Sequence, residues 1–440
     1  MDAETYRPFY QIIENKIKSH KYITLGTICS KLKKGIFDIK AEVYTNTGIP
    51  FVRISNLKNM GISTDNIIYI PEDENNKNLE TFLQKGDIIL SKTAIPAASI
   101  VQLDCCNTSQ DTIAIKLANK NLKNSFVVVF LNCKYGYFQM QRWFTGNIQM
   151  HLNLEDCKNI FIPQLSLKFQ EKIDKIFWLA FESNEQSQSL YRQAEELLLE
   201  AIGLKKFKPS ERGTNIKSFK KSFLATGRLD AEYYQPKYDE VEKLIKKNGF
   251  VYLEDICSAI NYGSVPTSPY TENNEGIPYI KGLNLKSTFI IKDKLDYIVN
   301  TEELSDKVFT KEGDIIISQM GTVGDVGVVT KDEVGWIFAS FTIRVRLKKN
   351  CDYLPRFIGL YIQNIAKEWY LQRNIAQASV RQNTDLPTIK KMYIPKVDIT
   401  IQQQIVALIS ESFNLRKKSE RLLDEAKNMV EREIEGGNKK

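Results

Sequence analysis

Hydrophobic and polar positions alternate in short runs over two long stretches of the chain. The runs GIPFVRI (48–54), GDIILS (86–91) and TIAIKL (112–117) are apolar or alternating, and Gly, Asn or Pro bounds them. Such short runs between turn residues predict strands. The segments 135–144 and 357–372 carry apolar residues at helical spacing, which predicts one amphipathic helix in each stretch. We therefore expect α+β globular units.

The pattern changes to heptad spacing in two further segments. Apolar or small residues fall three and four positions apart from Ile173 to Leu204, and again from Ile405 to Met429. Sustained spacing of this kind predicts coiled-coil helices, each about 50 Å long at about 1.5 Å per residue. We expect them to pack antiparallel, with Ser187 opposite Ser419 as a polar layer that fixes the register. An ordinary long surface helix is the alternative for either segment alone.

The two stretches repeat each other along their whole length. Three pairs of phrases carry the repeat: DAETYRPFY (2–10) and DAEYYQPKY (230–238), GIPFVRISNL (48–57) and GIPYIKGLNL (276–285), FLQKGDIILSK (82–92) and FTKEGDIIISQ (309–319). A period of about 230 residues is far longer than the ~20–50 residues of a solenoid unit. Each repeat is therefore the size of a domain.

These patterns predict a duplicated α+β protein in five segments. They are a first globular unit at 1–165, a long helix at 166–204, a basic connector at 205–229, a second globular unit at 230–397 and a second long helix at 398–436. We expect the two α+β units to be separated by the two helices, which pack as an antiparallel coiled coil, and to be related by pseudo-twofold symmetry.

Charge is concentrated in the connector between the repeats. The formal net charge is +8, and the connector holds most of this excess. Its basic residues are Lys205, Lys206, Lys208, Arg212, Lys217, Lys220, Lys221 and Arg228, against the single acidic residue Glu211. Because each repeat is close to neutral, a surface that binds nucleic acid would have to arise from local arrangement of side chains.

Residue patterns that support catalysis are missing from the sequence. There is no phosphate-binding GxxxxGK[ST] pattern and no Pro-Pro pair, and the glycine cluster GTVGDVG (321–327) reads as a turn. The seven cysteines form no CxxC pair, and the only histidines are His20 and His151. No apolar run reaches the ~18–20 residues of a membrane span. We expect a cytoplasmic chain without a catalytic site, a metal site or a membrane partner.

The repeated phrases resemble those of a known family. GIPxxRxxNL, then GDIILSK, then Ile-Pro before a Gln-containing helix, all written twice, are similar to the specificity (S) subunit of type I restriction-modification systems. RLDAEYYQPKY (228–238) is typical of the join into the second half in that family. Both copies carry these phrases, so we do not expect a half-length subunit that must dimerise.

The resemblance implies the fold and the partners. Each globular unit would be a target recognition domain that reads one half of a bipartite, asymmetric site in double-stranded DNA. The two long helices, the conserved regions of the family, would dock two methyltransferase (M) subunits, and restriction (R) subunits would join through that complex. The chain itself would be non-catalytic and would bind no cofactor. S-adenosylmethionine, ATP and Mg²⁺ would be bound by the partner subunits.

Polar residues at matching places in loops and at strand ends are the candidates for DNA contact, although a solvated surface group is the alternative for each. Arg and Lys suit guanine, Asn and Gln suit adenine, and Ser and Thr suit phosphate. In the first unit they are Arg53, Ser55, Asn56, Lys58, Lys92, Thr93, Asn147, Gln149, His151 and Asn153. In the second they are Lys281, Asn284, Ser318, Gln319, Thr322, Arg344, Arg346, Gln377, Ser379, Arg381, Gln382 and Asn383. We expect Arg344 and Arg346 to form a basic stripe on one face of a strand.

Other classes of function fit parts of the pattern. A stand-alone nuclease or methyltransferase is disfavoured by the missing motifs, and turnover by the purified chain would support it. A coiled-coil scaffold or adaptor that reads no DNA is a second alternative, and the recognition module of another methyltransferase or nuclease system is a third. Sequence-selective, salt-dependent DNA binding together with an M subunit would distinguish the scaffold from the specificity subunit.

Overall fold

The protein is described here by a computed structural model that covers most of the chain. The described residues are 7–58, 60–118, 121–146, 150–210, 214–266, 270–271, 275–292, 294–299, 304–375 and 382–436. They form two units, and each unit takes part of each long helix. Unit 1 contains the residues up to 185 and those from 415 onward, and unit 2 contains residues 186–414.

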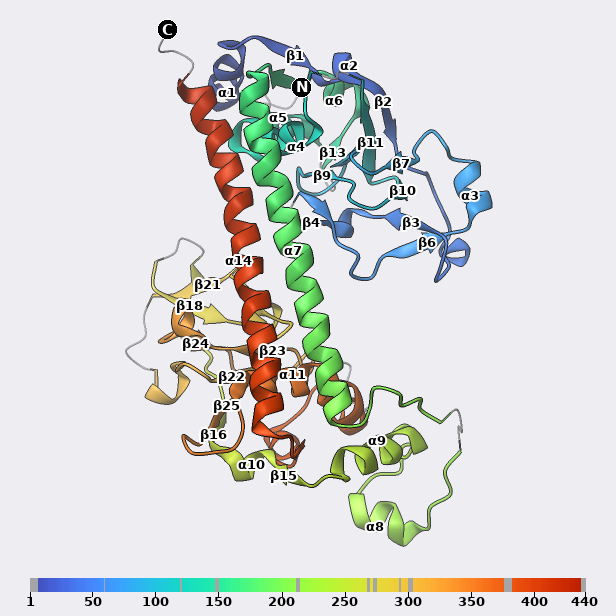
Figure 1. The fold of residues 1–440 in the computed structure, drawn as a ribbon, viewed down its shortest axis with the longest axis vertical. Coiled ribbons are helices and arrows are strands. Elements are labelled where there is room, and N and C mark those ends of the chain that lie inside the picture. Colours follow the sequence, from blue (N-terminus) through green and yellow to red (C-terminus); the bar gives the residue numbers. More distant parts are fainter. Residues whose placement is uncertain are drawn as a thin grey trace. The chain divides into compact units, whose positions relative to one another are not determined.

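Unit 1 is built around two four-stranded sheets (Figure 1). The first has the antiparallel order β2 (Cys29–Lys34), β11 (Thr112–Leu117), β8 (Ile88–Ser91) and β9 (Ala98–Ile100). The second has the order β6 (Ile68–Ile70), β3 (Ile49–Val52), β10 (Cys105–Thr108) and β7 (Leu83–Gln84), in which β3 and β10 run parallel. The three predicted strands of the first repeat are therefore present as β3, β8 and β11.

Short elements and helices complete unit 1. They are α1 (Pro8–Lys18), β1 (Tyr22–Thr24), α2 (Leu25–Ile28), β4 (Leu57–Lys58), β5 (Gly61–Ile62), α3 (Glu72–Asn76), α4 (Asn124–Asn132), α5 (Lys134–Trp143), β12 (Phe144–Thr145), β13 (His151–Leu152), α6 (Leu154–Lys158) and β14 (Phe161–Pro163). The predicted amphipathic helix is α5. Helix α4 was not predicted, because the run FVVVFL is buried on all sides and so shows no helical alternation of polar and apolar residues.

Unit 2 repeats the strand order of the antiparallel sheet and of the three central strands of the mixed sheet, and the two mixed sheets differ in their edge strands. Its antiparallel sheet has the order β16 (Cys257–Tyr262), β25 (Thr342–Leu347), β22 (Ile315–Ser318) and β23 (Val326–Val328). Its mixed sheet has the order β17 (Tyr270–Thr271), β21 (Asp296–Ile298), β18 (Ile277–Ile280) and β24 (Ile337–Phe338), with β18 and β24 parallel. The duplication seen in the sequence is thus a duplication of the fold.

Most of the remaining elements of unit 2 have counterparts in unit 1. They include α8 (Phe223–Thr226) in the connector, α9 (Pro236–Lys246), β15 (Phe250–Tyr252), α10 (Leu253–Ile256), β19 (Leu285–Lys286), β20 (Phe289–Ile290), α11 (Pro355–Tyr361), a π-helix (Ile362–Leu371), α12 (Gln372–Asn374), α13 (Leu386–Lys390) and β26 (Tyr393–Pro395). Helix α8 belongs to the connector between the repeats and is an exception. The predicted helix at 357–372 is present as α11 and the π-helix.

A glycine directly after β2 and another directly after β16 allow two backbones to approach each other closely. A Cβ atom added at Gly35 would lie 2.1 Å from the carbonyl oxygen of Ser109, and one at Gly263 would lie 2.1 Å from that of Phe338. No side chain fits at these distances, so only glycine permits the parallel bridges that follow, Ile36 with Ser109 and Ser264 with Ala339.

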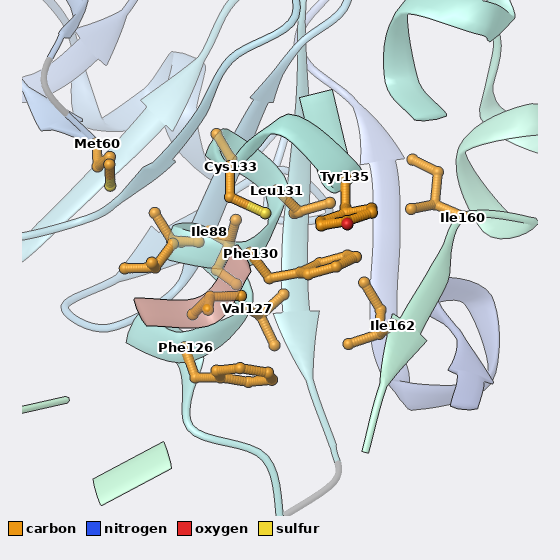
Figure 2. Packing of buried hydrophobic residues seen from close by; sticks show 14 of the residues in the cluster. Met60, Ile88, Phe126, Val127, Phe130, Leu131, Cys133, Tyr135, Ile160 and Ile162 are labelled. Atoms are coloured by element: carbon orange, nitrogen blue, oxygen red, sulfur yellow. The ribbon is translucent and has the colours of Figure 1, made fainter. Parts of the chain in front are cut away.

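The long helices α7 (Leu167–Ala201) and α14 (Ile399–Gly436) are part of the cores rather than separate rods. In unit 1, Ile173 and Phe177 of α7 and Val430 of α14 join the core around α4, part of which Figure 2 shows. In unit 2, Leu198 of α7 and Ile405 of α14 are buried in the other core. The start of α7 therefore packs with the end of α14, and the end of α7 with the start of α14, as expected for antiparallel helices.

The predicted polar layer exists, but with a different partner. The Ser187 hydroxyl donates to the carbonyl of Ser412 at 2.7 Å, and the Ser412 hydroxyl donates to the carbonyl of Ser187 at 2.8 Å. The expected pairing of Ser187 with Ser419 is wrong by one heptad. Heptad spacing identifies the face of each helix that is buried, but every heptad offers a similar face, so it does not fix which heptads meet.

Candidate DNA interface

Two loops that the sequence singled out come together in each unit. In unit 1, the loop between β8 and β9 is joined to the segment before α6 by an antiparallel bridge between Thr93 and His151. The Leu152 N–H also donates to the Lys92 carbonyl at 2.8 Å. We call these two segments the reader loops of unit 1. They display Lys92 and His151 at partly exposed positions.

Unit 2 has reader loops of the same construction. An antiparallel bridge joins Met320, in the loop between β22 and β23, to Asn383, in the segment before α13. The Thr384 N–H donates to the Gln319 carbonyl at 3.1 Å. The side chains at the positions of Lys92 and His151 are here Gln319 and Asn383, and both are partly exposed. One backbone arrangement thus presents different polar groups in the two units.

The reader loops of unit 1 carry a lysine whose pKa is shifted. Burial lowers the pKa of Lys92, and the positive charge of nearby Lys34 lowers it further, against an opposing effect of Asp111. Lys34 on β2 pairs with Ile113 of β11, and the Lys92 N–H donates to the carbonyl of Asp111 just before β11, so the two lysines flank the start of one strand. Cations at such positions suit contact with the phosphates of DNA.

Some candidates are buried, and their roles are structural. Asn56 and Asn284, which are 1% and 0% exposed, each accept a hydrogen bond from the backbone N–H three residues earlier, at 3.0 Å. Their amide nitrogens donate to the carbonyls of Ser63 at 3.1 Å and Ile291 at 3.2 Å. The expectation that these asparagines contact bases is corrected, because their hydrogen-bonding groups are used inside the turn that each one closes.

Their neighbours in the same turns are partly or fully exposed. Arg53 donates to the carbonyl of Asn66 at 2.9 Å, and the ammonium group of Lys281 lies 2.5 Å from the carboxylate of Asp296. Both side chains are held at the surface by these contacts. Ser55 and Lys58 are exposed.

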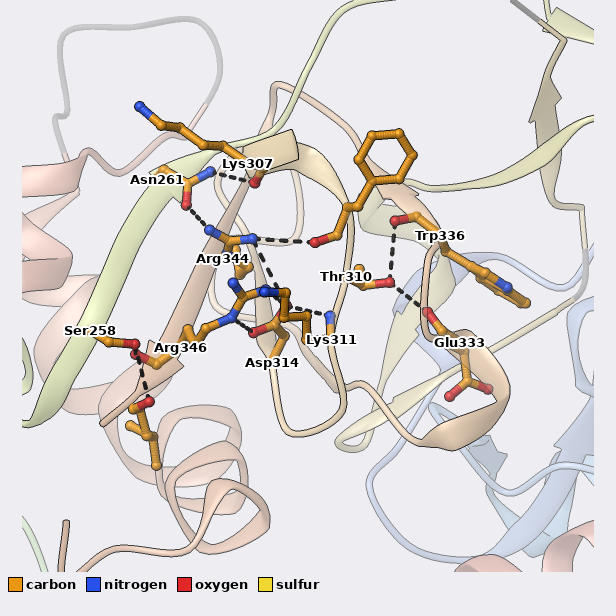
Figure 3. A network of polar contacts seen from close by, with 12 residues as sticks. Ser258, Asn261, Lys307, Thr310, Lys311, Asp314, Glu333, Trp336, Arg344 and Arg346 are labelled. Carbon is orange, nitrogen blue, oxygen red and sulfur yellow. Dashed lines mark hydrogen bonds and ion pairs between the residues drawn. The ribbon is translucent and has the colours of Figure 1, made fainter. Parts of the chain in front are cut away.

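The predicted basic stripe on β25 is instead an ion-pair network (Figure 3). Arg346 donates two hydrogen bonds of 2.6 Å to the carboxylate of Asp314, which is fully buried. Arg344 is also buried and donates to Asn261 Oδ1 at 2.6 Å, and burial lowers its pKa. The stripe is therefore corrected: β25 lies inside the sheet, and its cations neutralise a buried carboxylate rather than face DNA.

Other candidates shape the reader loops. Thr93 and Ser318 are buried, and the Ser318 hydroxyl donates to the carbonyl of Met320 at 3.1 Å, so neither side chain is free to reach a base. Asn153 caps helix α6 by accepting from the Asp156 N–H at 2.9 Å, although it remains exposed. Thr322 and Gln382 are exposed on the reader loops of unit 2. The candidates Asn147, Gln149, Gln377, Ser379 and Arg381 lie outside the described residues.

In each unit, an ion pair that was not predicted holds the helix that precedes the second of the two reader loops. In unit 2, Arg373 donates to Asp239 at 2.7 Å and to Glu242 at 2.9 Å, both on α9. In unit 1, Arg142 donates to Glu14 on α1 at 2.6 Å. Glu14 and Glu242 hold matching places in the repeat, as do the two arginines. Comparison of charged residues between the two copies could have found this pair.

The described residues show neither a membrane-spanning helix nor a metal site. No helix among them is long and apolar enough to cross a membrane. Within the same residues, no three His, Cys, Asp or Glu side chains are grouped so that they could hold a metal ion.

The fold and the reader loops define a class of protein, in which one α+β unit occurs twice and presents the same pair of loops with different side chains. Residues 246–427 match the family described as "Type I restriction modification DNA specificity domain". The resemblance seen in the repeated phrases is thereby confirmed for residues 246–427, which are similar to the DNA specificity domain of type I restriction-modification systems. No curated protein matches the chain.

Two solved structures align with most of the chain. The S subunit of a type I restriction-modification system from M. genitalium is 14% identical, with 93% of this chain and 92% of that chain covered and a TM-score of 0.43. The HsdS subunit from Thermoanaerobacter tengcongensis is 16% identical, with 93% and 96% covered and a TM-score of 0.29.

Proposed function

We propose that this chain is the DNA-recognition subunit of a type I restriction-modification complex and that each unit reads one half of a bipartite, asymmetric site. The observation that carries the proposal is the duplicated pair of reader loops. An identical backbone arrangement would present Lys92 and His151 to one half-site and Gln319 and Asn383 to the other. Because Lys suits guanine while Gln and Asn suit adenine, the two half-sites would differ in sequence.

The chain would act as a non-catalytic subunit within a complex. Two M subunits would dock on the long helices and bind S-adenosylmethionine for adenine methylation. R subunits, which use ATP and Mg²⁺, would join through them. A groove beside α7 in unit 1, whose lining includes Trp178, Leu179, Phe181 and Glu182, supports docking on the helices. Leu179 is exposed and lines this groove together with Trp178 and Phe181, and contiguous apolar surface is typical of an interaction site.

Co-expression with the M subunit tests the proposal. We expect methylated adenines in a split motif when the genome of the expressing cell is sequenced for modified bases, and none when either protein is expressed alone. The purified complex should bind duplexes with that motif more tightly than random duplexes, and affinity should fall steeply with salt. Modification without a motif, or equal binding to all sequences, would favour the scaffold alternative.

A further inference from the structure

One exposed aromatic side chain lies next to the reader loops of unit 1. Phe37 follows β2 and is 71% exposed. The ammonium group of Lys34 lies 4.6 Å from the centre of its ring, and Lys92 of the reader loops lies across the start of β11 from Lys34. A large apolar ring that is exposed to water beside a cation has a cost that a binding partner would remove.

The backbone on both sides of Phe37 is fixed. Before it, Ile36 is buried and its N–H donates to the Thr108 carbonyl at 2.8 Å. After it, Asp38 has a φ of 54° and donates from its N–H to Gln110 Oε1 at 3.4 Å. The ring is therefore carried by a turn whose backbone is already ordered, so binding would cost little backbone conformational entropy.

The same turn also supports the reader loop. The segment 109–111 bonds to the Phe37 turn through Gln110, and its Asp111 carbonyl accepts from the Lys92 N–H at 2.8 Å. The ring and the reader loop thus share one support. A ligand that occupies the reader loops of unit 1 would also meet Phe37.

Unit 2 has an apolar residue at the matching place. Val265 is 68% exposed and follows Ser264, whose N–H donates to the Phe338 carbonyl at 3.0 Å. The segment 339–341 again bonds both to the turn that carries the apolar residue and to the reader loop. The Ser340 N–H donates to the Ser264 carbonyl, and the Gln319 N–H donates to the Phe341 carbonyl, each at 3.0 Å. Two exposed apolar residues at one position of a duplicated fold argue against chance exposure.

We propose that Phe37 contacts DNA bases in the first half-site as an apolar wedge, and that Val265 makes a smaller contact of the same kind in the second. This inference rests on the proposed function and names a further residue of that site. Apolar side chains that enter a duplex stack on bases, press between base steps or contact thymine methyl groups, while neighbouring lysines hold the phosphates. A single ring beside a lysine suits such a contact better than a protein interface, which needs a larger continuous apolar surface.

Selection from a pool of random-sequence duplexes tests the proposal with the chain purified together with its M subunit. Phe37→Ala should lower affinity for the sequence selected by the wild-type complex by about tenfold, as expected for loss of one stacked base. Affinity for random duplexes should change less than about twofold, and the selected motif should lose preference in one half only. Phe37→Trp should retain the wild-type motif.

A fluorescent base reports the wedge directly. With 2-aminopurine placed at successive positions of the first half-site, the wild-type complex should raise the fluorescence at one step, and Phe37→Ala should abolish that rise. Phe219→Ala is the matched control, because Phe219 is 58% exposed but lies in the connector. It should bind and select as the wild type does.

Three outcomes would overturn the proposal. If Phe37→Ala matches the wild type in affinity, motif and fluorescence, the ring does not contact bases while the proposed function stands. If Phe37→Ala folds but no longer binds the M subunit, the ring contacts protein. If the wild-type complex itself selects no motif, the proposed function fails, and the inference fails with it.

Discussion

Asp87 and Asp314 occupy the same place in the two repeats, but their environments differ. Each accepts a hydrogen bond from a backbone N–H three residues earlier, from Gln84 or Lys311, at 2.8 Å. Asp314 is fully buried and binds Arg346 through two hydrogen bonds, whereas Asp87 pairs with a partly exposed Lys116 at 3.2 Å. The phrase Gly-Asp therefore marks a structural turn in both units, with a stronger ion pair in unit 2.

Removing the buried carboxylate should be the more damaging change. Asp314→Ala leaves Arg344 without a nearby anion inside the protein and should reduce the free energy of unfolding of unit 2 by about 3–5 kcal/mol. Asp87→Ala should cost about 1 kcal/mol, since water can solvate Lys116. Urea unfolding of the two variants measures the difference. Equal losses would contradict the structural distinction between the two aspartates.

The carboxylates that anchor the helices before the second reader loops make the stability of the fold depend on pH in the acid range. Burial tends to raise the pKa of Asp239, but the hydrogen bond from Lys217 and the charge of Arg373 outweigh it, so the pKa is lowered. The pKa of Glu14 is lowered in the same way, against burial, by Lys18 and Arg142. A carboxylate with a lowered pKa stabilises the fold above its unfolded pKa of about 4, and this contribution is lost as the pH falls through the folded value.

Substitution of Asp239 should therefore reduce the dependence of stability on acid pH. Asp239→Asn should lower the free energy of unfolding at pH 7 by about 1 kcal/mol, since the pair is partly exposed. The variant and the wild type should become equally stable below the folded pKa. Urea unfolding between pH 7 and pH 2 measures both curves. A constant difference at all pH values would show that Asp239 acts through packing rather than through its charge.

At the scale of elements, the sequence predicts which faces of helices α7 and α14 are buried, but it does not predict the register in which the two helices pair. Their heptad positions fill the cores of both units, from Ile173 and Val430 in unit 1 to Leu198 and Ile405 in unit 2. The reciprocal hydrogen bonds of Ser187 and Ser412 are the polar contact that specifies one pairing of heptads. A single polar pair of this kind can select a register among several apolar alternatives.

The serine pair should stabilise the helix contact by a small, measurable amount. Ser187→Ala and Ser412→Ala should each lower the free energy of unfolding by about 1 kcal/mol, because each removes one interhelical hydrogen bond. Ser183→Ala is the matched control, since the Ser183 hydroxyl donates to Leu179 of its own helix at 2.8 Å. It should be nearly neutral. A cost at Ser183 equal to that at Ser187 would show that the interhelical bonds have no special role.

At the scale of the whole molecule, the duplication separates scaffold from specificity. The two units share the order of the antiparallel sheet, the parallel pair in the mixed sheet, the glycine approach at Gly35 and Gly263, and the bridge between the reader loops. They differ in the side chains that those loops display. A fold that is written twice and then varied at its loops suits the reading of two different half-sites.

Exchange of one unit tests this separation. Replacing residues 7–165 with the corresponding segment of another specificity subunit should change one half of the methylated motif and leave the other half unaltered. Sequencing of modified adenines in cells that express the hybrid with the M subunit measures the motif. A hybrid that changes both halves, or neither, would contradict the division of labour between the units.

The sequence by itself determined the duplication, the main strands and the buried faces of the long helices, because apolar periodicity and repeated turn phrases are local properties. Only the tertiary structure decided which polar residues lie inside. Arg344, Asn56 and Asn284 are of residue types that often contact DNA. Their hydrogen-bond partners lie on other strands or turns, and the sequence pattern does not predict that these segments meet. The exposure of Phe37 and the pairing of Ser187 with Ser412 were decided in the same way, since both depend on which segments meet in space.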